Sequence, residues 1–299
     1  MRKNKIRMNV GSVVFDIFNV TLLVFLAFSC LAPLINILAV SLSSRAPVEA
    51  GQVLLWPVNF TLTSYRFMIE KPAFWQAFYI SIKRVLIGAA LNMFSILTMA
   101  YPLSRETKDF RWRPVYLVFF FITMLIGGGL IPTYMVIKEL RLLDTIWALV
   151  LPGTASFSSS ILLLNFIRNQ PKEIEEAAFI DGAGHWINLI LIQTPLAKPA
   201  IATLALFAIV GHWNSWFDGL IYLNNKINYP LASYLQIKII TRQQLMEATS
   251  PDEIRYLLEM SERTGVSAQI FIGLIPILVV YPFLQKYFAK GIVLGSIKG

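Results

Sequence analysis

The sequence has few charged residues. Asp, Glu, Lys and Arg account for 14% of the 299 residues, whereas they make up about 25% of a typical soluble domain. Apolar and aromatic residues account for 56%, and the mean hydropathy is +0.62. A soluble protein of this size could not bury so much apolar surface. The composition therefore excludes an ordinary cytosolic enzyme and a disordered chain, and it indicates an integral membrane protein.

Residues that bind metals and nucleotides are also scarce. Cys30 is the only cysteine, which excludes a disulfide framework and a cysteine-rich metal site. The two histidines, His185 and His212, are far apart in the sequence, so no metal site is expected. The phosphate-binding pattern Gly-x-x-x-x-Gly-Lys-Ser/Thr is missing; the glycine run at 127–129 lacks the lysine and lies in an apolar stretch, where it suits a hinge or a close-packing site. We expect no cofactor in this chain and no enzymatic activity of its own, so an ATP-driven role would require partner chains.

Stretches without charge are long enough to cross a membrane. Six stretches of 19 or more residues contain no Asp, Glu, Lys or Arg, and a bilayer core of about 30 Å requires roughly 20 residues of helix. The next two, residues 50–65 and 182–197, are 16 residues long and contain many polar residues. We predict an all-α polytopic membrane protein with six transmembrane helices. The predicted spans are residues 13–42, 80–104, 114–138, 145–168, 198–222 and 264–287.

Basic residues are concentrated on one side of the predicted membrane. With six spans, both termini share a side whose segments carry 14 basic and 6 acidic residues, against 10 and 9 on the other side. This asymmetry predicts that both termini are cytoplasmic. Anionic lipid headgroups beside these residues account for the net charge of +9, so no nucleic-acid partner is required. The apolar stretch after residues 1–12 is too long for a signal peptide, which predicts a retained cytoplasmic segment followed by a transmembrane domain over 13–299.

Two sizeable connections fall on the external side, at about 45–73 and 223–263. The second begins with a turn-rich segment at 224–230 and contains a helix-start pattern at 250–253. A loop of this length without a function is unusual. Two interpretations remain open for it: a lid packed on the helix ends, or a docking surface for an external partner.

The longest cytoplasmic connection, residues 169–197, predicts a short helix of about three turns. Pro171 suits the first turn of a helix, and Gly182 or Gly184 can adopt the left-handed conformation that ends it. Carboxylates are favoured near a helix start. The carboxylates at this start are Glu173, Glu175 and Glu176.

Four residues of this predicted helix share one face by their spacing. They are Ile174, Ala177, Ala178 and Asp181. The paired alanines would let another backbone approach closely. A helix this short is marginal alone in water, so it must pack against something. From the residues alone, a surface helix that caps the bundle remains an alternative to a docking helix.

The loop resembles the EAA loop of ABC importer permeases. That family pattern is met by Glu176-Ala177-Ala178, three residues, Gly182, nine residues, Ile192, one residue, and Thr194-Pro195, where threonine replaces the usual leucine. Three further segments are similar to carbohydrate-importer permeases of the maltose-transporter second-subunit type. They are Ala100–Arg105, Trp213-Asn214 and the C-terminal residues 285–299. Within this group the chain looks most like the permeases that import complex oligosaccharides, including uronic-acid polymers.

The resemblance implies a type I ABC importer permease fold in the bacterial cytoplasmic membrane. In that family, two ATPase subunits bind ATP and Mg and drive alternating access of two homologous permease subunits, and an extracytoplasmic solute-binding protein delivers the oligosaccharide. The resemblance implies that the ATPase-coupling residues are Glu176, Ala177, Ala178, Asp181, Gly182, Ala183 and Gly184. It further implies that a C-terminal tail reaches the ATPase interface through Gly295, Lys298 and Gly299.

Polar groups inside predicted spans are costly to bury in lipid and mark a candidate substrate path. The candidates are Lys83, Arg84, Asn92, Asn165, Trp213, Asn214 and Asp218. Aromatic faces and amide or carboxylate groups commonly hold sugars, which Trp213 and Asn214 could supply. Hydrogen bonding between helices is the alternative role for such residues. For Lys83 and Arg84 the alternatives are snorkelling to lipid headgroups or attraction of an acidic saccharide.

Three other functions compete with an oligosaccharide permease. An ion-coupled secondary transporter would need titratable groups within the spans, and the few that approach them, Asp16, Lys83, Arg84 and Asp218, stand near the predicted span ends. A membrane-embedded enzyme would need a nucleophile–base pair or a metal cluster at depth, and the sequence shows no such pattern. An ABC permease for a non-sugar solute is disfavoured by the C-terminal tail.

Overall fold

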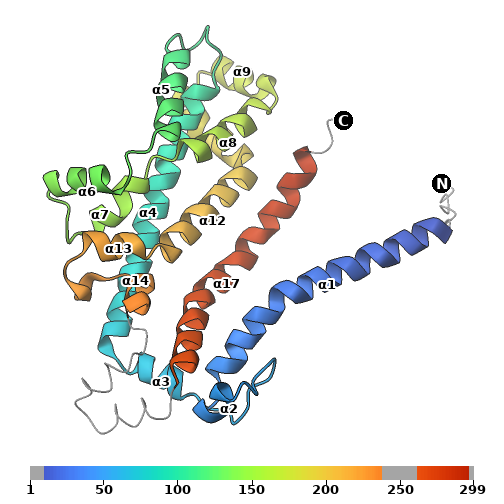
Figure 1. The fold of residues 1–299 in the computed structure, drawn as a ribbon. Coiled ribbons are helices and arrows are strands. Elements are labelled where there is room, and N and C mark those ends of the chain that lie inside the picture. The colour runs from blue at the N-terminus through green and yellow to red at the C-terminus, as the bar shows by residue number, and fades with distance from the viewer. Residues whose placement is uncertain (1–9, 238–260, 296–299) are drawn as a thin grey trace. The chain divides into compact units, whose positions relative to one another are not determined.

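The computed structural model describes residues 10–237 and 261–295, and these are almost entirely helical (Figure 1). Helices suit the apolar stretches because in lipid every backbone polar group must be satisfied within the segment. The other described residues form connecting loops and an isolated β-bridge between Ser43 and Phe60. The chain divides into two compact units, one made of residues 1–70 and 239–272 and the other of 71–238 and 273–299.

The first unit is built around a long apolar helix. Its described elements are α1 (Val10–Ser41), α2 (Arg45–Glu49), α3 (Thr63–Ile69) and the first part of α17 (Glu262–Gly295). Side chains tie the end of α1 to the connection that follows it: the Asn36 amide donates to the carbonyl of Leu54 at 2.6 Å, and the Ser41 hydroxyl lies 2.7 Å from the Tyr65 hydroxyl. Most of α1 is exposed in this single chain, as expected for a helix that faces lipid or a partner.

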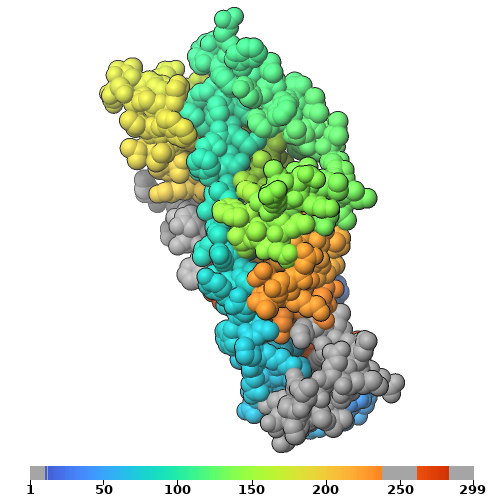
Figure 2. Space-filling view, turned by 90° about the vertical axis from the view of Figure 1, so that its left-hand side faces the viewer, coloured from blue at the N-terminus to red at the C-terminus, as the bar shows by residue number. Residues whose placement is uncertain are grey.

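The second unit is organised along α4, a single uninterrupted helix (Figure 1). Its elements are α4 (Pro72–Ser104), α5 (Arg113–Leu125), α6 (Leu130–Glu139), α7 (Ile146–Val150), η1 (Leu151–Gly153), α8 (Phe157–Arg168), α9 (Lys172–Ile180), α10 (His185–Ile187), the π-helical turn η2 (Asn188–Gln193), α11 (Thr194–Leu196), α12 (Lys198–Asn214), α13 (Phe217–Tyr222), η3 (Lys226–Asn228), α14 (Leu231–Ile237) and the rest of α17. Figure 2 shows α4 in cyan and teal along one face, with α5–α8 in green and α13–α14 in orange beside it. Helices α8 and α12 also pack on α4.

Several of the apolar segments are bent rather than straight. In the described part of the chain, α1, α4 and α17 are each long and apolar enough to cross a membrane. Three further segments qualify only as bent pairs, α5 with α6 (112°), α7–η1 with α8 (49°) and α10–α11 with α12 (86°), which gives up to six spans. The predicted span 114–138 thus holds two helices. The predicted spans 145–168 and 198–222 are likewise divided, the first between α7–η1 and α8 and the second between α12 and α13.

The bend between α5 and α6 falls on the glycine run. Gly129 has a φ of +76°, a left-handed conformation in which a side chain would be strained. A Cβ added at Gly127 or Gly129 would meet nothing within 4 Å, so these glycines are not sites of close packing. Of the two interpretations of this run, the structure supports a backbone break that only glycine adopts easily.

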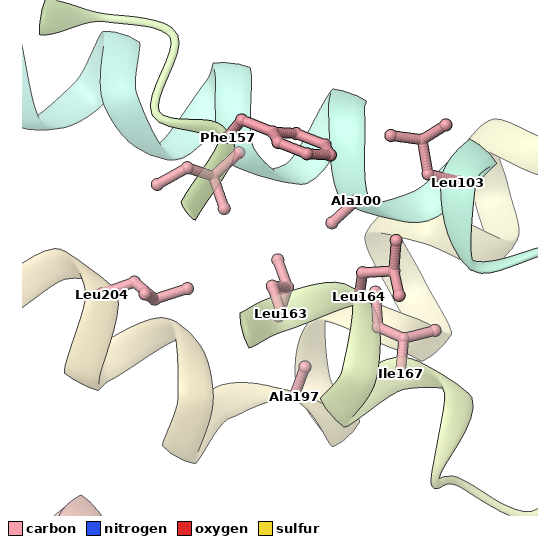
Figure 3. Close-up of a cluster of buried hydrophobic side chains, with 9 residues drawn as sticks. Ala100, Leu103, Phe157, Leu163, Leu164, Ile167, Ala197 and Leu204 are labelled. Atoms are coloured by element: carbon pink, nitrogen blue, oxygen red, sulfur yellow. The ribbon is translucent and has the colours of Figure 1, made fainter. Parts of the chain in front are cut away.

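A compact apolar core joins α4, α8 and α12 near the C-terminal end of α4 (Figure 3). Ala100 and Leu163 are fully buried within it, and Leu204 reaches it from α12. Small and large side chains alternate here, which lets helices approach closely. This core holds α4, α8 and α12 together, and two of these helices, α4 and α12, carry the buried polar group described below.

Candidate functional site

Helix α9 is the short helix predicted in the cytoplasmic connection. It begins at Lys172, with Pro171 at the N-cap position rather than inside the first turn. Gly182, with a φ of +82°, ends it, whereas Gly184 has an ordinary φ of −77°. The Ala183 amide donates to the carbonyl of Ala178 at 2.9 Å, as expected when a left-handed glycine closes a helix. The structure therefore selects Gly182 as the residue that turns the chain.

The four residues predicted to share one face, Ile174, Ala177, Ala178 and Asp181, are not equally buried within this chain. Ala178 is buried, whereas the other three are exposed. The helix instead turns Glu175 and Ala178 toward the rest of the unit. The physical reason is an ion pair between Glu175 and Arg105, which lies at the C-cap of α4. The paired alanines therefore serve different surfaces: Ala178 packs inward and Ala177 faces outward.

Glu175 is held by two elements at once. Its carboxylate pairs with Arg105 and accepts a hydrogen bond from the Asn188 amide at 3.2 Å. Asn188 is fully buried in η2, at the start of the return toward α12. The sequence assigned Glu175 only a place at a helix start, because its partner Arg105 lies far away in the chain. No local pattern could have identified this contact.

Apolar side chains are exposed on the outer surface of α9 and α10. Ile180 is 85% exposed and Trp186 is 65% exposed. We call the following set the loop surface: Ile174, Ala177, Ile180, Trp186 and Ile187. Figure 2 shows the α9–α10 region, in yellow, projecting beside the end of α4. Because the sequence predicts that this loop lies outside the membrane, its exposed apolar groups make it a candidate interaction site.

The predicted coupling residues cluster around the loop surface. Those that are exposed are Glu176, Ala177, Asp181, Gly182 and Gly184, while Ala183 is half-buried and Ala178 is buried. Of the predicted tail, Gly295 is the last residue of α17, and Lys298 and Gly299 lie outside the described residues.

An exposed ion pair lies close to this loop. Glu106 follows α4 and contacts Lys172 of α9 as well as Lys108. Hydrogen bonds from Lys172 and Lys108 lower the pKa of Glu106 to about 2. These side chains are largely solvent-exposed, so the pair contributes little to stability.

A second group of polar residues lies on one face of α4. Arg84, Gly88 and Asn92 are spaced i, i+4 and i+8, which places them on one line along the helix. All three are buried. Their partners are the bent segments α7–α8 and α12–α13, whose breaks leave backbone carbonyls without helical partners.

Arg84 donates hydrogen bonds to backbone carbonyls at two of these breaks. Its guanidinium pairs with Asp218 and donates to the carbonyl of Ser215 at 2.9 Å and to that of Leu149 at 3.4 Å. Its side chain is 2% exposed, so snorkelling to headgroups is wrong for this residue. The reason is that α4 begins at Pro72, well before the predicted start of the span, and this places Arg84 inside the helix bundle.

Asn92 supports the break before α8 in the same way. Its amide donates to the carbonyls of Gly153 at 2.7 Å and Thr154 at 2.9 Å. Its oxygen lies 2.8 Å from Nε2 of His212. Gly88 leaves the space for that ring, because a Cβ there would overlap His212.

A cavity of about 380 Å³ lies among these groups. Its lining includes Arg84, Asn92, His212 and Asp218 together with the hydroxyls of Ser156 and Ser159. The guanidinium and the carboxylate neutralise each other, so the cavity is polar without a free charge from this pair. Among the described residues, no group of three or more His, Cys, Asp or Glu side chains is placed to hold a metal ion.

The cavity unites only part of the predicted substrate path. Lys83, Asn165 and Asn214 are exposed and do not line it. Trp213 is buried, donates from Nε1 to the carbonyl of Gly273 at 2.8 Å, and packs edge-on against Phe78. The structure therefore brings Arg84, Asn92 and Asp218 together, and it adds His212, which was not among the predicted path residues.

The described part of the long connection after α13, which the sequence predicts to be external, packs on the helix ends. The amide of Leu231 donates to the Ser81 hydroxyl at 2.7 Å, and the Ser233 hydroxyl donates to the Trp216 carbonyl at 2.7 Å. Asp144 accepts hydrogen bonds from the amides of Asn224 and Asn225. Over residues 224–237 the connection is thus a lid, and residues 238–260 lie outside the described residues.

Comparisons with known proteins place this architecture in a transport family. A model of the family described as "Binding-protein-dependent transport system inner membrane component" matches residues 87–294. The chain is 39% identical over 287 residues to Protein LplC of Bacillus subtilis (strain 168), covering 96% of this chain and 95% of the relative. It is 37% identical over 285 residues to the polygalacturonan/rhamnogalacturonan transport system permease protein YtcP of the same organism, covering 95% and 98%.

A solved structure shows the same fold. It is a crystal structure of a bacterial ABC transporter involved in the import of the acidic polysaccharide alginate, with a TM-score of 0.82 and 31% sequence identity. The match covers 94% of this chain and 99% of that chain. The all-α type I permease fold predicted from the sequence is confirmed. The chain belongs to the family of binding-protein-dependent transport system inner membrane components, and it is a multi-pass permease subunit of an ABC importer.

Proposed function

We propose that this permease imports an oligosaccharide, and that uronate-containing oligomers are its substrate class. Two similar proteins support this: YtcP is named for polygalacturonan and rhamnogalacturonan transport, and the alginate importer handles an acidic polysaccharide. Both matches extend over nearly the whole chain. The family description further supports delivery of the solute by a separate binding protein. A second, homologous permease subunit would complete the path.

The loop surface is the proposed docking site for an ATPase subunit. The observation that carries this proposal is a short helix that anchors one side to its own chain through Glu175 and Ala178 and exposes apolar residues on the other. Exposed Ile180 and Trp186 would be buried by a protein that covers α9 and α10. Because the sequence holds no phosphate-binding loop, ATP and Mg would be bound by that partner.

The orientation follows from the same assignment. If ATPase subunits cover the loop surface, α9 and both chain termini face the cytoplasm, in agreement with the excess of basic residues on that side. The lid formed by residues 224–237 then faces outward. An external binding protein would dock on this side.

The polar cavity is proposed to shape the path rather than to supply charge for the substrate. Arg84 is occupied by Asp218 and two carbonyls, so it offers no free charge to an acidic saccharide. Lys83 is exposed one residue earlier and has the charge to attract such a substrate. Comparison of neutral and uronate oligomers in Lys83→Gln tests this; equal effects on both would rule out electrostatic attraction.

The decisive experiment is co-purification followed by a transport assay. The tagged chain is expressed with the subunits encoded beside it, and ATPase activity is measured with a panel of neutral and uronate oligosaccharides. We expect stimulation by one class of uronate oligomer in the presence of the binding protein. Ala177→Asp should remove the ATPase subunit from the purified complex, whereas Glu173→Gln, an exposed change on the same helix, should not. Retention of the ATPase by Ala177→Asp would contradict the docking proposal.

A further inference from the structure

The Glu175–Arg105 ion pair links the exposed loop to the central helix of the second unit. Glu175 lies on α9, and Arg105 lies at the C-cap of α4. Both side chains are largely withdrawn from solvent, at 18% and 11% exposure. Charges in such surroundings interact more strongly than exposed ones, and removal of one partner leaves the other uncompensated.

Arg105 is itself fixed in place by the end of α4. Its guanidinium lies 4.4 Å from the centre of the Tyr101 ring, Nε donates to the Tyr101 carbonyl at 3.4 Å, and Nη2 donates to the Ser104 hydroxyl at 3.3 Å. The Tyr101 hydroxyl in turn lies 3.0 Å from Nδ1 of His185, at the start of α10. The contact is therefore not a flexible surface pair, because several groups on both elements determine its geometry.

The middle of α4 contacts the bent segments. Helix α4 is uninterrupted over 33 residues, a length of about 50 Å. Arg84 and Asn92 on this helix hold the breaks at Leu149–Thr154 and Ser215. One rigid helix thus contacts the loop at its end and the two breaks nearer its middle.

We infer that Glu175 and Arg105 are positioning residues that make α9 and α4 move as one body. A displacement of α9 by the ATPase then reaches the breaks at Leu149–Thr154 and Ser215 through α4. This inference rests on the proposed docking of an ATPase at the loop surface, but neither residue belongs to that surface. Both face inward, and their substitution changes the transmission of movement rather than the contact with the partner.

The test uses the assembled importer in proteoliposomes and compares two ion pairs that join the same two parts of the chain. Glu175→Gln removes the buried pair, and Glu106→Gln removes the exposed pair with Lys172. For Glu175→Gln we expect normal subunit composition and basal ATPase activity, with saccharide transported per ATP lowered about two- to thirtyfold, the range for residues that modulate coupling. Glu106→Gln should transport as the wild type does. The reversed pair Glu175→Arg with Arg105→Glu should recover transport relative to either single change.

A distance measurement separates coupling from folding. With exposed Cys30 replaced by serine, spin labels at Leu86→Cys on α4 and Glu173→Cys on α9 report the distance between the two helices. We expect one narrow distance that stays constant when ATP binds, and a broad or ATP-dependent distance in Glu175→Gln. A wild-type distance that changes with ATP, or transport per ATP that is unchanged in Glu175→Gln, would overturn the inference. A wild-type chain that binds no ATPase would instead refute the proposed function.

Discussion

Replacement of Asp218 by asparagine tests how strongly the ion pair between α4 and α13 stabilises the fold. The Arg84 side chain is 2% exposed and that of Asp218 is 22% exposed, so the change leaves a buried guanidinium without its counter-charge. Removal of one partner of a buried pair costs about 3–5 kcal/mol. Because Asp218 is partly exposed and asparagine keeps one acceptor oxygen, we expect a loss of about 2–3 kcal/mol in the free energy of unfolding.

Thermal unfolding of the purified chain in detergent measures this loss. A decrease of that size should lower the Tm by about 4–12 °C for a chain of this length. Arg84→Met should cost at least as much, because the carbonyls of Ser215 and Leu149 also lose their donor. Lys83→Met, an exposed neighbour, should change the free energy of unfolding by no more than about 0.5 kcal/mol.

Two results would refute this reasoning. One is an unchanged Tm in Asp218→Asn, which would mean that the guanidinium reaches solvent or another acceptor. The other is an equal decrease in Asp218→Asn and Lys83→Met, which would mean that any change in this part of α4 is harmful.

Three further predictions follow from other contacts. Gly88→Ala places a Cβ where the His212 ring lies and should destabilise the chain by about 1–3 kcal/mol. Gly211→Ala, which has open space around it, should not destabilise the chain, and thermal unfolding compares the two variants. Gly182→Ala should reduce substrate-stimulated ATPase activity, because a φ of +82° costs a residue with a side chain about 1–2 kcal/mol. Gly184→Ala, at an ordinary φ, is the control, and equal activity of both variants would contradict a role for the turn. Lys172 and Lys108 lower the pKa of Glu106 from 4.5 to about 2, so the small stability that this exposed group supplies is complete above pH 4.5 and is lost as the pH falls toward 2. The Tm of Lys172→Gln should therefore lie slightly below that of the wild type above pH 4.5 and approach it near pH 2, and a constant difference would show that the pair does not depend on the Glu106 charge.

Charge spacing located the helices because the thickness of the bilayer sets how long an uncharged segment must be. It could not reveal where those segments bend. The break at 126–129 was suggested by its glycines, and the break before α8 follows the turn-forming pair Pro152-Gly153, but no comparable local signal marks the break after Asn214. Bends of this kind depend on whether a neighbouring helix supplies donors for the freed carbonyls, which is a property of tertiary structure.

The loop shows the same division between local and distant information. The length of α9, its acidic start and its end at Gly182 or Gly184 could be predicted from the sequence, because caps and turns depend on neighbouring residues. Which side of α9 faces inward was not readable. That side is set by Arg105, which joins Glu175 only in the folded chain. Arg84 was likewise recognisable as unusual, but its partners were not.

The stripe formed by Arg84, Gly88 and Asn92 has a consequence for how this gene can vary. Each residue of an α-helix advances by about 100° around the axis. Deletion or insertion of one codon between positions 84 and 92 would therefore rotate one end of the stripe away from its acceptors, whereas many single substitutions on the opposite side of α4 would leave it intact. The spacing within this short segment is a stricter requirement than the identity of most residues in it.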